Sequence, residues 1–204
     1  MSVWAILVAA GAATRFGRPK QYEPLGDRRV LDWSLDACRE ACDGVVLVVP
    51  ADRVDQPEKA DAVVAGGATR ADSVRAGLAA VPEEAEVVVV HDAARPRATA
   101  SLFAAVVDAV RAGADGAVPG VPVTDTVKQV DGNRVVATLD RATLVAVQTP
   151  QAFRAAVLRA AHAGGGDATD DAALVEAAGG TVVVVPGEPA NAKITHPQDL
   201  PSCV

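Results

Sequence analysis

Short Val-rich segments alternate with helical patterns along most of this chain, and this alternation limits its possible folds more than any other feature. Strand-like segments occupy residues 3–9 (VWAILVA), 44–50 (GVVLVVP) and 86–90 (EVVVV), and between them Ala and Leu recur at spacings of three and four. This β-α-β alternation is typical of open sheets with helices on both faces. We therefore predict an α/β fold with a doubly wound, mainly parallel sheet.

The composition agrees with strands that are buried on both faces. Hydrophobic residues make up 50% of the chain but aromatic residues only 3%, so Val, Leu and Ala must build the core. Buried parallel strands read as continuous apolar runs of this kind. A length of 204 residues is enough for one domain with a sizeable core, and we predict a single domain over residues 1–204.

Residues 124–139 interrupt the alternation. Two segments that alternate polar and apolar residues flank the sequence DGN at 131–133, which is a hairpin signal. We predict that residues 124–141 form a β-hairpin arm inserted in the fold. The chain then returns to α/β structure with AFRAAVLRAAHAGG at 152–165 and the segments that follow it.

Charge and hydropathy exclude several classes of protein. The net charge of −7, from 19 Lys and Arg against 26 Asp and Glu, disfavours binding to nucleic acid or to an anionic membrane through bulk charge. No apolar run approaches the roughly 18 residues that a membrane span needs. The apolar N-terminal segment has no Lys or Arg before Arg15, unlike a signal peptide. We expect a cytoplasmic protein.

The three cysteines are Cys38, Cys42 and Cys203. Their number is odd, and no C-x-x-C pair is present. We therefore interpret them as reduced thiols rather than as a metal or redox site.

The loop after the first strand, residues 9–22 (AAGAATRFGRPKQY), differs from a dinucleotide-binding loop. Ala13 stands where G-x-G-x-x-G needs its second glycine, and the loop supplies Arg15, Arg18 and Lys20 instead. Small residues let backbone N–H groups approach phosphate oxygens, and the cations oppose polyphosphate charge. The loop indicates a nucleoside triphosphate site that is not a Walker A loop; a turn with surface cations is the alternative.

The sequence HDAARP at 91–96 follows a Val-rich strand. Ligands of open α/β sheets bind at the carboxyl ends of the strands, so Asp92 is well placed to hold Mg²⁺ against a phosphate. Asp92 could equally cap the next helix. Arg95 could meet a second anion, whereas we expect His91 to be a packing or hydrogen-bonding residue rather than a base.

The sequence GGATRADSV at 66–74 places two glycines between a short strand and a helix. Glycine here lets the backbone approach a flat base. Ser73 either contacts that base or caps the helix, and Asp72 is more simply structural.

The chain closely resembles the 2-C-methyl-D-erythritol 4-phosphate cytidylyltransferases of the non-mevalonate isoprenoid pathway. The resemblance covers nearly the whole chain and rests on an ordered set of sequences: AAGAATRFGRPKQY, GGATRADSV, VVHDAARP, VTDTVK, DR at 140–141, QTPQAF, ATDDAALVE and NAKIT. It implies a Rossmann-like nucleotidyltransferase fold and Mg²⁺-dependent transfer of CMP from CTP to a sugar-alcohol phosphate, with release of pyrophosphate. It also implies a homodimer in which the arm completes the partner's acceptor pocket.

The resemblance also assigns the site residues. The catalytic residues that it implies are Arg15, Lys20, Arg141 and Lys193. The nucleotide-binding residues are Ala9, Ala10, Gly11, Gly67, Ala68, Ser73, Asp92 and Ala93. The residues that bind the acceptor are Asp92, Arg95, Thr126, Arg141, Thr149, Thr169 and Lys193, and the metal ligand is Asp92.

Several alternatives stay open on the sequence. Thr169 is also a natural helix N-cap, and Thr126 and Arg141 could be surface residues of the arm. The acceptor could be ribitol 5-phosphate, the nucleotide could be UTP or GTP, and a nucleotide-binding domain without turnover is a different class of function. A nicotinamide-dependent dehydrogenase is disfavoured by the broken glycine pattern.

Overall fold

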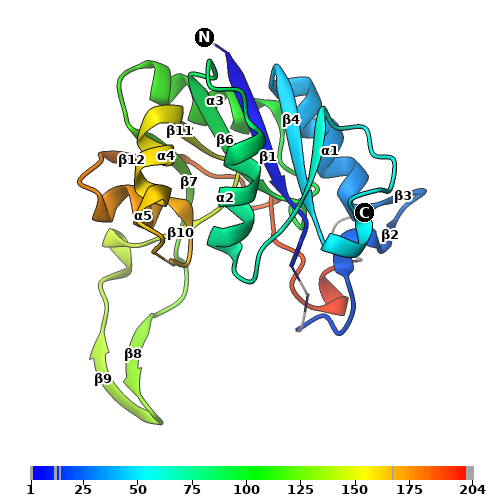
Figure 1. Ribbon diagram of the computed structural model, residues 1–204. Helices are drawn as coiled ribbons and strands as arrows, with labels where there is room; N and C mark the ends of the chain where they lie inside the picture. The colour runs from blue at the N-terminus through cyan, green and yellow to red at the C-terminus, as the bar shows by residue number, and fades with distance from the viewer. Residues whose placement is uncertain (1, 12, 14, 167, 201–204) are drawn as a thin grey trace.

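The computed structural model describes residues 2–11, 13, 15–166 and 168–200, and within these ranges an eight-stranded sheet forms the centre of the molecule (Figure 1). Its strands are β1 (Val3–Val8), β4 (Gly44–Val49), β5 (Ala62–Ala65), β6 (Val87–Asp92), β7 (Gly116–Pro122), β10 (Val145–Val147), β11 (Gln151–Arg154) and β12 (Val182–Pro186). The strand order is β10-β7-β11-β6-β1-β4-β5, and β12 pairs with β7. The predicted doubly wound α/β fold is confirmed.

Most strand pairs in the sheet are parallel. Strand β1 lies between β4 and β6, β4 pairs with β5, and β12 pairs with β7, all in the parallel sense. The antiparallel strands are β10 and β11. Residues 151–154 form β11 between β6 and β7, and α4 follows directly. Phe153 is fully buried there.

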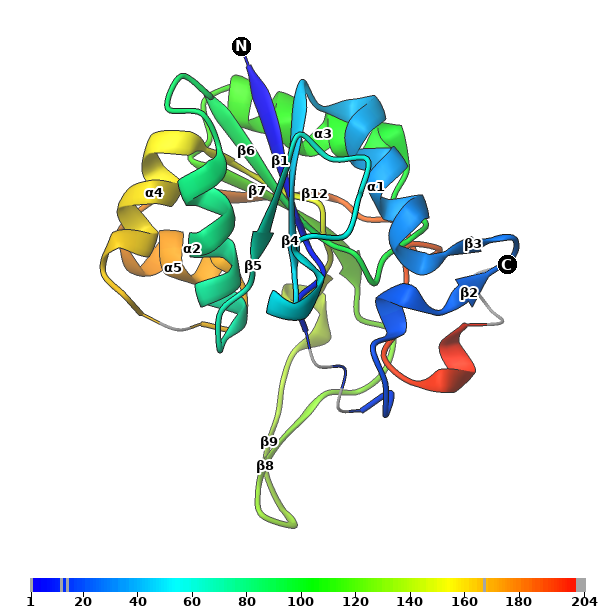
Figure 2. The same cartoon turned by 45° about the vertical axis from the view of Figure 1, so that its right-hand side comes forward.

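Helices cover both faces of the sheet (Figures 1 and 2). They are α1 (Val30–Ala41), α2 (Arg70–Ala80), α3 (Ala100–Arg111), α4 (Ala155–Ala163) and α5 (Asp171–Ala177). Ala5 and Leu7 pack with residues of α1 and α3, whereas Ile6 between them packs with residues of α2, α4 and α5. Successive side chains of a strand point to opposite faces, so both faces being buried explains the unbroken apolar sequence of β1.

A smaller apolar cluster joins two segments that are distant in the sequence. Phe16 of the loop after β1, Leu25, Val30 and Ile194 are all buried in it. This cluster fixes the basic loop against the chain that follows β12.

The short elements of the chain are η1 (Lys20–Tyr22), β2 (Pro24–Leu25), β3 (Arg28–Arg29), η2 (Ala51–Arg53), η3 (Arg141–Thr143) and η4 (Pro197–Asp199).

The hairpin of β8 (Lys128–Asp131) and β9 (Arg134–Thr138) forms a separate two-stranded sheet. It extends away from the body on the side where β1 ends, and Figure 2 shows the same projection from another angle. Gly132 has a φ of 58° in the turn, a conformation that glycine adopts without steric cost. The arm exposes apolar side chains, including Val130, Val135 and Val136. Its role in a dimer stays a prediction.

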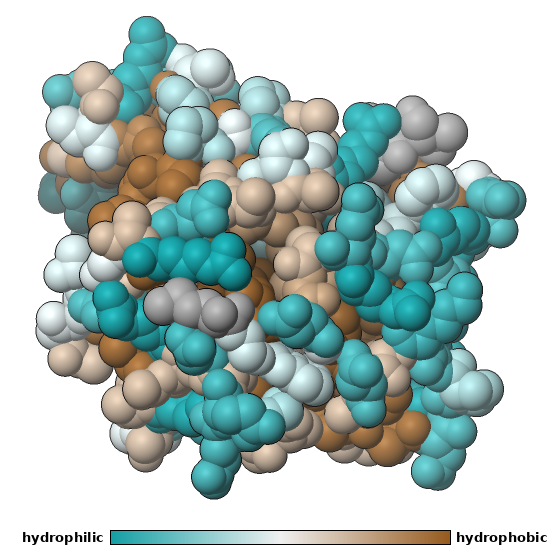
Figure 3. Space-filling model, turned by 90° about the horizontal axis from the view of Figure 1, so that it is seen from above, coloured by the Kyte–Doolittle hydropathy of each residue, from teal (hydrophilic) through white to brown (hydrophobic). Residues whose placement is uncertain are grey.

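The opposite end of the molecule has a mixed surface. In Figure 3, which views that end from above, polar side chains alternate with small apolar patches.

The cysteines that the structure describes, Cys38 and Cys42, are free thiols. Burial raises the pKa of both, that of Cys42 to about 12. Cys203 lies outside the described residues. No helix in the described ranges is long and apolar enough to cross a membrane.

Candidate active site

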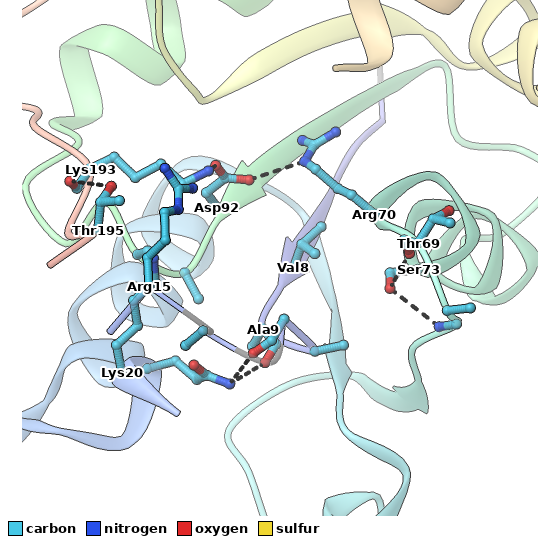
Figure 4. A pocket seen from close by; sticks show the side chains of 18 residues that line it. Val8, Ala9, Arg15, Lys20, Thr69, Arg70, Ser73, Asp92, Lys193 and Thr195 are labelled. Atoms are coloured by element: carbon cyan, nitrogen blue, oxygen red, sulfur yellow. Dashed lines mark hydrogen bonds and ion pairs between the residues drawn. The ribbon is translucent and has the colours of Figure 1, made fainter. Parts of the chain in front are cut away.

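A cavity of about 380 Å³ opens at the carboxyl ends of β1 and β6 (Figure 4). This is the edge at which open α/β sheets bind ligands. The predicted residues that line it are Ala9, Ala10, Gly11, Arg15, Lys20, Gly67, Ala68, Ser73, Asp92, Ala93 and Lys193. The structure therefore brings together all the residues that were predicted for the nucleotide, and three of the four predicted catalytic cations.

The loop after β1 is fixed at two points. The Gln21 side chain is buried, and its Nε2 donates a hydrogen bond to the carbonyl of Ala9 over 2.7 Å. Phe16 is buried in the small apolar cluster with Ile194. These two anchors hold the loop over the cavity without using its basic side chains.

The cations of this loop have different surroundings. Arg15 and Lys20 both line the cavity although they are close in sequence. Arg18 instead donates from Nε and Nη2 to the carboxylate of Glu23, at 2.7 Å each, and does not line the cavity. Burial and the charge of Lys193 lower the pKa of Lys20. The site therefore selects two of the three loop cations.

The loop between β5 and α2 forms the opposite wall of the cavity (Figure 4). Ser73 Oγ accepts a hydrogen bond from Gly67 N over 3.2 Å and donates one to the carbonyl of Thr69 over 3.0 Å. A side chain at Gly67 would place its Cβ 2.2 Å from that of Asp72, so only glycine fits. The N-cap of α2 is Thr69, paired with Asp72 in a capping box. The alternative that Ser73 caps the helix is wrong, and Asp72 is structural as expected.

Asp92 lies at the end of β6 between two cations. Lys193 Nζ is 2.6 Å from Asp92 Oδ2, and Arg70 Nε is 3.4 Å from Asp92 Oδ1. Burial would raise the pKa of the Asp92 carboxyl, but the charges of Arg70 and Lys193 outweigh it and hold this pKa well below its usual value. Asp92 is therefore ionised. It does not cap the next helix, because the side chain of Thr99 caps α3.

A second cavity of about 190 Å³ adjoins the first. Arg70, Asp92 and Lys193 line both cavities. The second cavity also contains three residues that were predicted to bind the acceptor, Arg95, Thr149 and Thr169. The site thus has two compartments that meet at a carboxylate flanked by two cations.

Two predicted residues lie elsewhere in this single chain. Among the described residues that line the two cavities, neither Thr126 nor Arg141 occurs. Thr126 is exposed near the base of the arm, and Arg141 Nη1 donates a hydrogen bond to the carbonyl of Thr124. The single chain therefore does not bring Thr126 and Arg141 to Asp92.

Two further sequence interpretations have definite outcomes. Thr169 does not cap α5, because the N-cap is Asp170, whose side chain accepts from Ala173 N. His91 is a packing and hydrogen-bonding residue, as expected. It is fully buried against Phe103, with ring centroids 5.2 Å apart, and its Nδ1 lies 3.1 Å from Thr149 Oγ1. Burial lowers the pKa of His91 to about 4, so its ring is neutral near pH 7.

Sequence reasoning missed Arg70, which lines both cavities. Thr69, Gln21 and Thr195 also line the first cavity and were not predicted. The sequence did contain a signal for Arg70. A cation in the first turn of a helix lies near the positive end of the helix dipole and is unfavourable there. Such a residue calls for a nearby negative charge, which Asp92 supplies.

A comparison with protein families identifies the family of this chain. Residues 3–203 match the family described as 2-C-methyl-D-erythritol 4-phosphate cytidylyltransferase. The chain belongs to this family.

Two relatives from the cytidylyltransferase family are similar to nearly all of this chain. The chain is 46% identical to the 2-C-methyl-D-erythritol 4-phosphate cytidylyltransferase of Nocardia farcinica, with 98% of this chain and 91% of the relative aligned. It is 47% identical to the bifunctional enzyme IspD/IspF of Solidesulfovibrio magneticus, with 99% of this chain but 56% of the relative aligned. The chain therefore spans little more than half the length of its bifunctional relatives.

Solved structures of the family have the same fold. The 2-C-methyl-D-erythritol 4-phosphate cytidylyltransferase of Thermus thermophilus is 38% identical, with a TM-score of 0.82 and with 96% of this chain and 94% of that chain covered. The bifunctional IspDF of Campylobacter jejuni is 27% identical with a TM-score of 0.86, covering 99% of this chain and 54% of that one. The mixed, mostly parallel sheet is thus shared with the cytidylyltransferase family.

Replacing Asp92 with Asn tests its place between the two cations. The substitution removes the negative charge of Asp92 and leaves Arg70 and Lys193 without their common partner. It should therefore lower the free energy of unfolding by about 3 kcal/mol near neutral pH. Because the pKa of Asp92 is lower in the folded chain, its contribution is fully present above about pH 4 and is lost as the pH falls through the folded-state pKa.

Urea unfolding of wild type and Asp92→Asn at a series of pH values measures this difference. It should be largest at neutral pH and shrink in strong acid. Glu23→Gln, which breaks the exposed pair with Arg18, is the control and should have a much smaller effect. A difference for Asp92→Asn that does not change with pH would contradict the assignment.

Proposed function

We propose that this chain transfers CMP from CTP to 2-C-methyl-D-erythritol 4-phosphate and releases pyrophosphate. The observation that carries the proposal is the meeting of two cavities at Arg70, Asp92 and Lys193. A nucleotidyl transfer needs two anionic substrates whose reacting atoms lie side by side. The names of the relatives support the nucleotide and the acceptor.

CTP occupies the first cavity in this proposal. Gly67 lets the backbone of its loop lie at the cavity wall, where a flat base would pack. Across the cavity, Arg15 and Lys20 face the triphosphate and stabilise the charge that develops on it during transfer. The acceptor occupies the second cavity, where Arg95 and Lys193 oppose its phosphate charge.

The reaction needs little proton transfer. The attacking atom is an oxygen of a phosphate monoester, which is already anionic at neutral pH, so no general base is required. His91 is buried and neutral, in agreement with a reaction that uses no imidazole base. Alignment of the two substrates and cations around the α-phosphorus therefore supply the rate enhancement.

Mg²⁺ is the proposed cofactor, and the first cavity suits a metal held mainly by substrate. Among the described residues that line the cavity, Asp92 is the only acidic one, and no group of three His, Cys, Asp or Glu side chains in the described ranges could hold an ion. Mg²⁺ is commonly bound by one carboxylate together with phosphate oxygens. Asp92 would hold it with the triphosphate, and the ion would neutralise phosphate charge.

Product mass spectrometry tests the function. The purified protein is incubated with CTP and Mg²⁺, with methylerythritol 4-phosphate and ribitol 5-phosphate in equal amounts. We expect CDP-methylerythritol and pyrophosphate. CDP-ribitol would replace the acceptor but keep the mechanism, whereas CTP binding without any product would favour a nucleotide-binding domain without turnover.

Substitution of the loop cations tests the roles within the first cavity. We expect Arg15→Ala and Lys20→Ala each to lower kcat about a hundredfold, equivalent to about 3 kcal/mol, because each removes a charge that faces the transition state. Arg18→Ala is the matched control, since Arg18 pairs with Glu23 outside the cavity. Its kcat should stay near that of wild type. Equal losses in all three variants would contradict these assignments.

We further propose a homodimer whose arm completes the partner's acceptor pocket. Two observations support this proposal. The arm exposes Val130, Val135 and Val136 at its strands, and large exposed apolar groups are typical of interaction surfaces. Arg141, at its base, lies apart from both cavities of its own chain. The cytoplasmic location and the absence of a nucleic-acid or membrane partner remain predictions.

Mixing two inactive variants tests the shared site. Arg141→Ala and Lys193→Ala should each be inactive alone, because each removes a cation from every site. In a mixed dimer one of the two sites keeps both cations, so unfolding and refolding the variants together should restore about a quarter of wild-type activity. No recovery in mixed dimers, or an active monomer in sedimentation, would contradict the shared site.

A further inference from the structure

Arg70 occupies the boundary between the two cavities, and its contact with Asp92 alone does not explain what keeps it there. It is the first residue of α2, directly after the N-cap Thr69. Its guanidinium reaches across the site towards Asp92 (Figure 4). An arginine side chain has several rotatable bonds, so a fixed position at this boundary needs a second contact.

That second contact is Asp171 in the first turn of α5. Arg70 Nη1 donates to Asp171 Oδ2 over 2.7 Å. The side chain of Asp171 is only 1% exposed, and its other oxygen, Oδ1, lies 3.0 Å from Nε2 of the buried His162 in α4. A chain of polar contacts therefore runs from His162 through Asp171 and Arg70 to Asp92.

The position of Asp171 indicates that it acts through Arg70. Burying a carboxylate is costly unless cations and hydrogen bonds compensate for the loss of water. Among the described residues that line either cavity, Asp171 does not appear. The carboxylate thus has no direct access to a substrate, and its charge is directed at Arg70.

Arg70 keeps donors for a ligand. Of its guanidinium nitrogens, Nε and Nη1 contact Asp92 and Asp171, whereas Nη2 has no hydrogen bond to any residue that the structure describes. The side chain is 24% exposed. A planar guanidinium with free N–H groups is well suited to phosphate oxygens.

We propose that Arg70 is a further catalytic residue, which binds the reacting phosphate where the two cavities meet, and that Asp171 is the positioning residue that holds it there. This inference rests on the proposed function. In the transfer, an acceptor oxygen forms a bond to the α-phosphorus while the bond from that phosphorus to the pyrophosphate oxygen breaks. The electron pair of the broken bond stays on pyrophosphate, and Arg70 stabilises the charge as it moves across the boundary.

A double-mutant cycle tests this inference. Steady-state kinetics on Arg70→Lys, Asp171→Asn and the double variant should give a kcat about a hundredfold below wild type for each single variant. If Asp171 acts through Arg70, the double variant should have the kcat of Arg70→Lys, not the product of both losses. KM for CTP should change much less than kcat. Multiplied losses, or a wild-type kcat in Asp171→Asn, would overturn the proposal.

Glu58→Gln is the matched control. Glu58 is another carboxylate whose side chain is only 5% exposed, and its Oε2 lies 2.8 Å from Nη2 of Arg29. Glu58 lines neither of the two cavities. Its loss should lower the melting temperature but leave kcat unchanged. If Asp171→Asn does not fold, Asp171→Glu keeps the charge but displaces Arg70, and the same loss of kcat is expected.

A binding measurement separates this inference from the proposed function. Calorimetry with inorganic pyrophosphate should give about tenfold weaker binding for Arg70→Lys and Asp171→Asn than for wild type, and unchanged binding for Glu58→Gln. If wild type forms no CDP product, the proposed function fails, yet this pattern would still support the Arg70 assignment. Equal binding by all four proteins would overturn it.

Discussion

The carboxylate of Asp92 and its two cations are the interaction on which the whole site depends. Asp92 ends a central strand, Arg70 begins α2, and Lys193 follows the last strand of the sheet. Each comes from a different part of the chain, so this contact exists only when the sheet is complete. Because the three residues are also the ones shared by both cavities, the same contact that joins these elements marks the boundary between the two compartments.

The apolar sheet is what allows such a concentration of charge. Parallel strands with both faces covered leave only their carboxyl ends open to ligands. Loops at that edge can then carry cations that no core position would accept. The buried Phe16 and the hydrogen bond from Gln21 to Ala9 show how this is done locally: an apolar anchor and a buried amide hold the loop, and the cations Arg15 and Lys20 line the cavity.

Charge at this site is balanced locally, not over the whole molecule. The net charge of the chain is −7, yet among the described residues lining the first cavity four are cationic and one is acidic. Burial, and after it the charge of Lys193, lowers the pKa of Lys20, so an anionic ligand would relieve repulsion among these cations. A chain that is acidic overall can therefore carry a local site suited to phosphorylated ligands and still repel polyanions elsewhere on its surface.

The sequence by itself determined the fold class and much of the nucleotide site, because these depend on signals that are local in the chain. Val-rich runs specify buried strands. The small and basic residues of the loop after β1 indicate a phosphate site, and the glycines before α2 indicate a close approach of the backbone to a ligand. The chemistry of the loop alone could not separate Arg18 from Arg15, since both are loop cations. The family resemblance chose Arg15, and the tertiary structure supplies the physical reason, because it pairs Arg18 with Glu23. The same limit applies to caps and to long-range pairs. Thr169 and Asp170 are both residue types that cap helices well, and only the structure shows that Asp170 is the N-cap of α5.

The contact of Arg70 with Asp171 joins residues that are far apart in the sequence. Only the packing of α2, α4 and α5 on one face of the sheet brings them within hydrogen-bonding distance, so only the tertiary structure could place the second cation at the boundary of the two cavities.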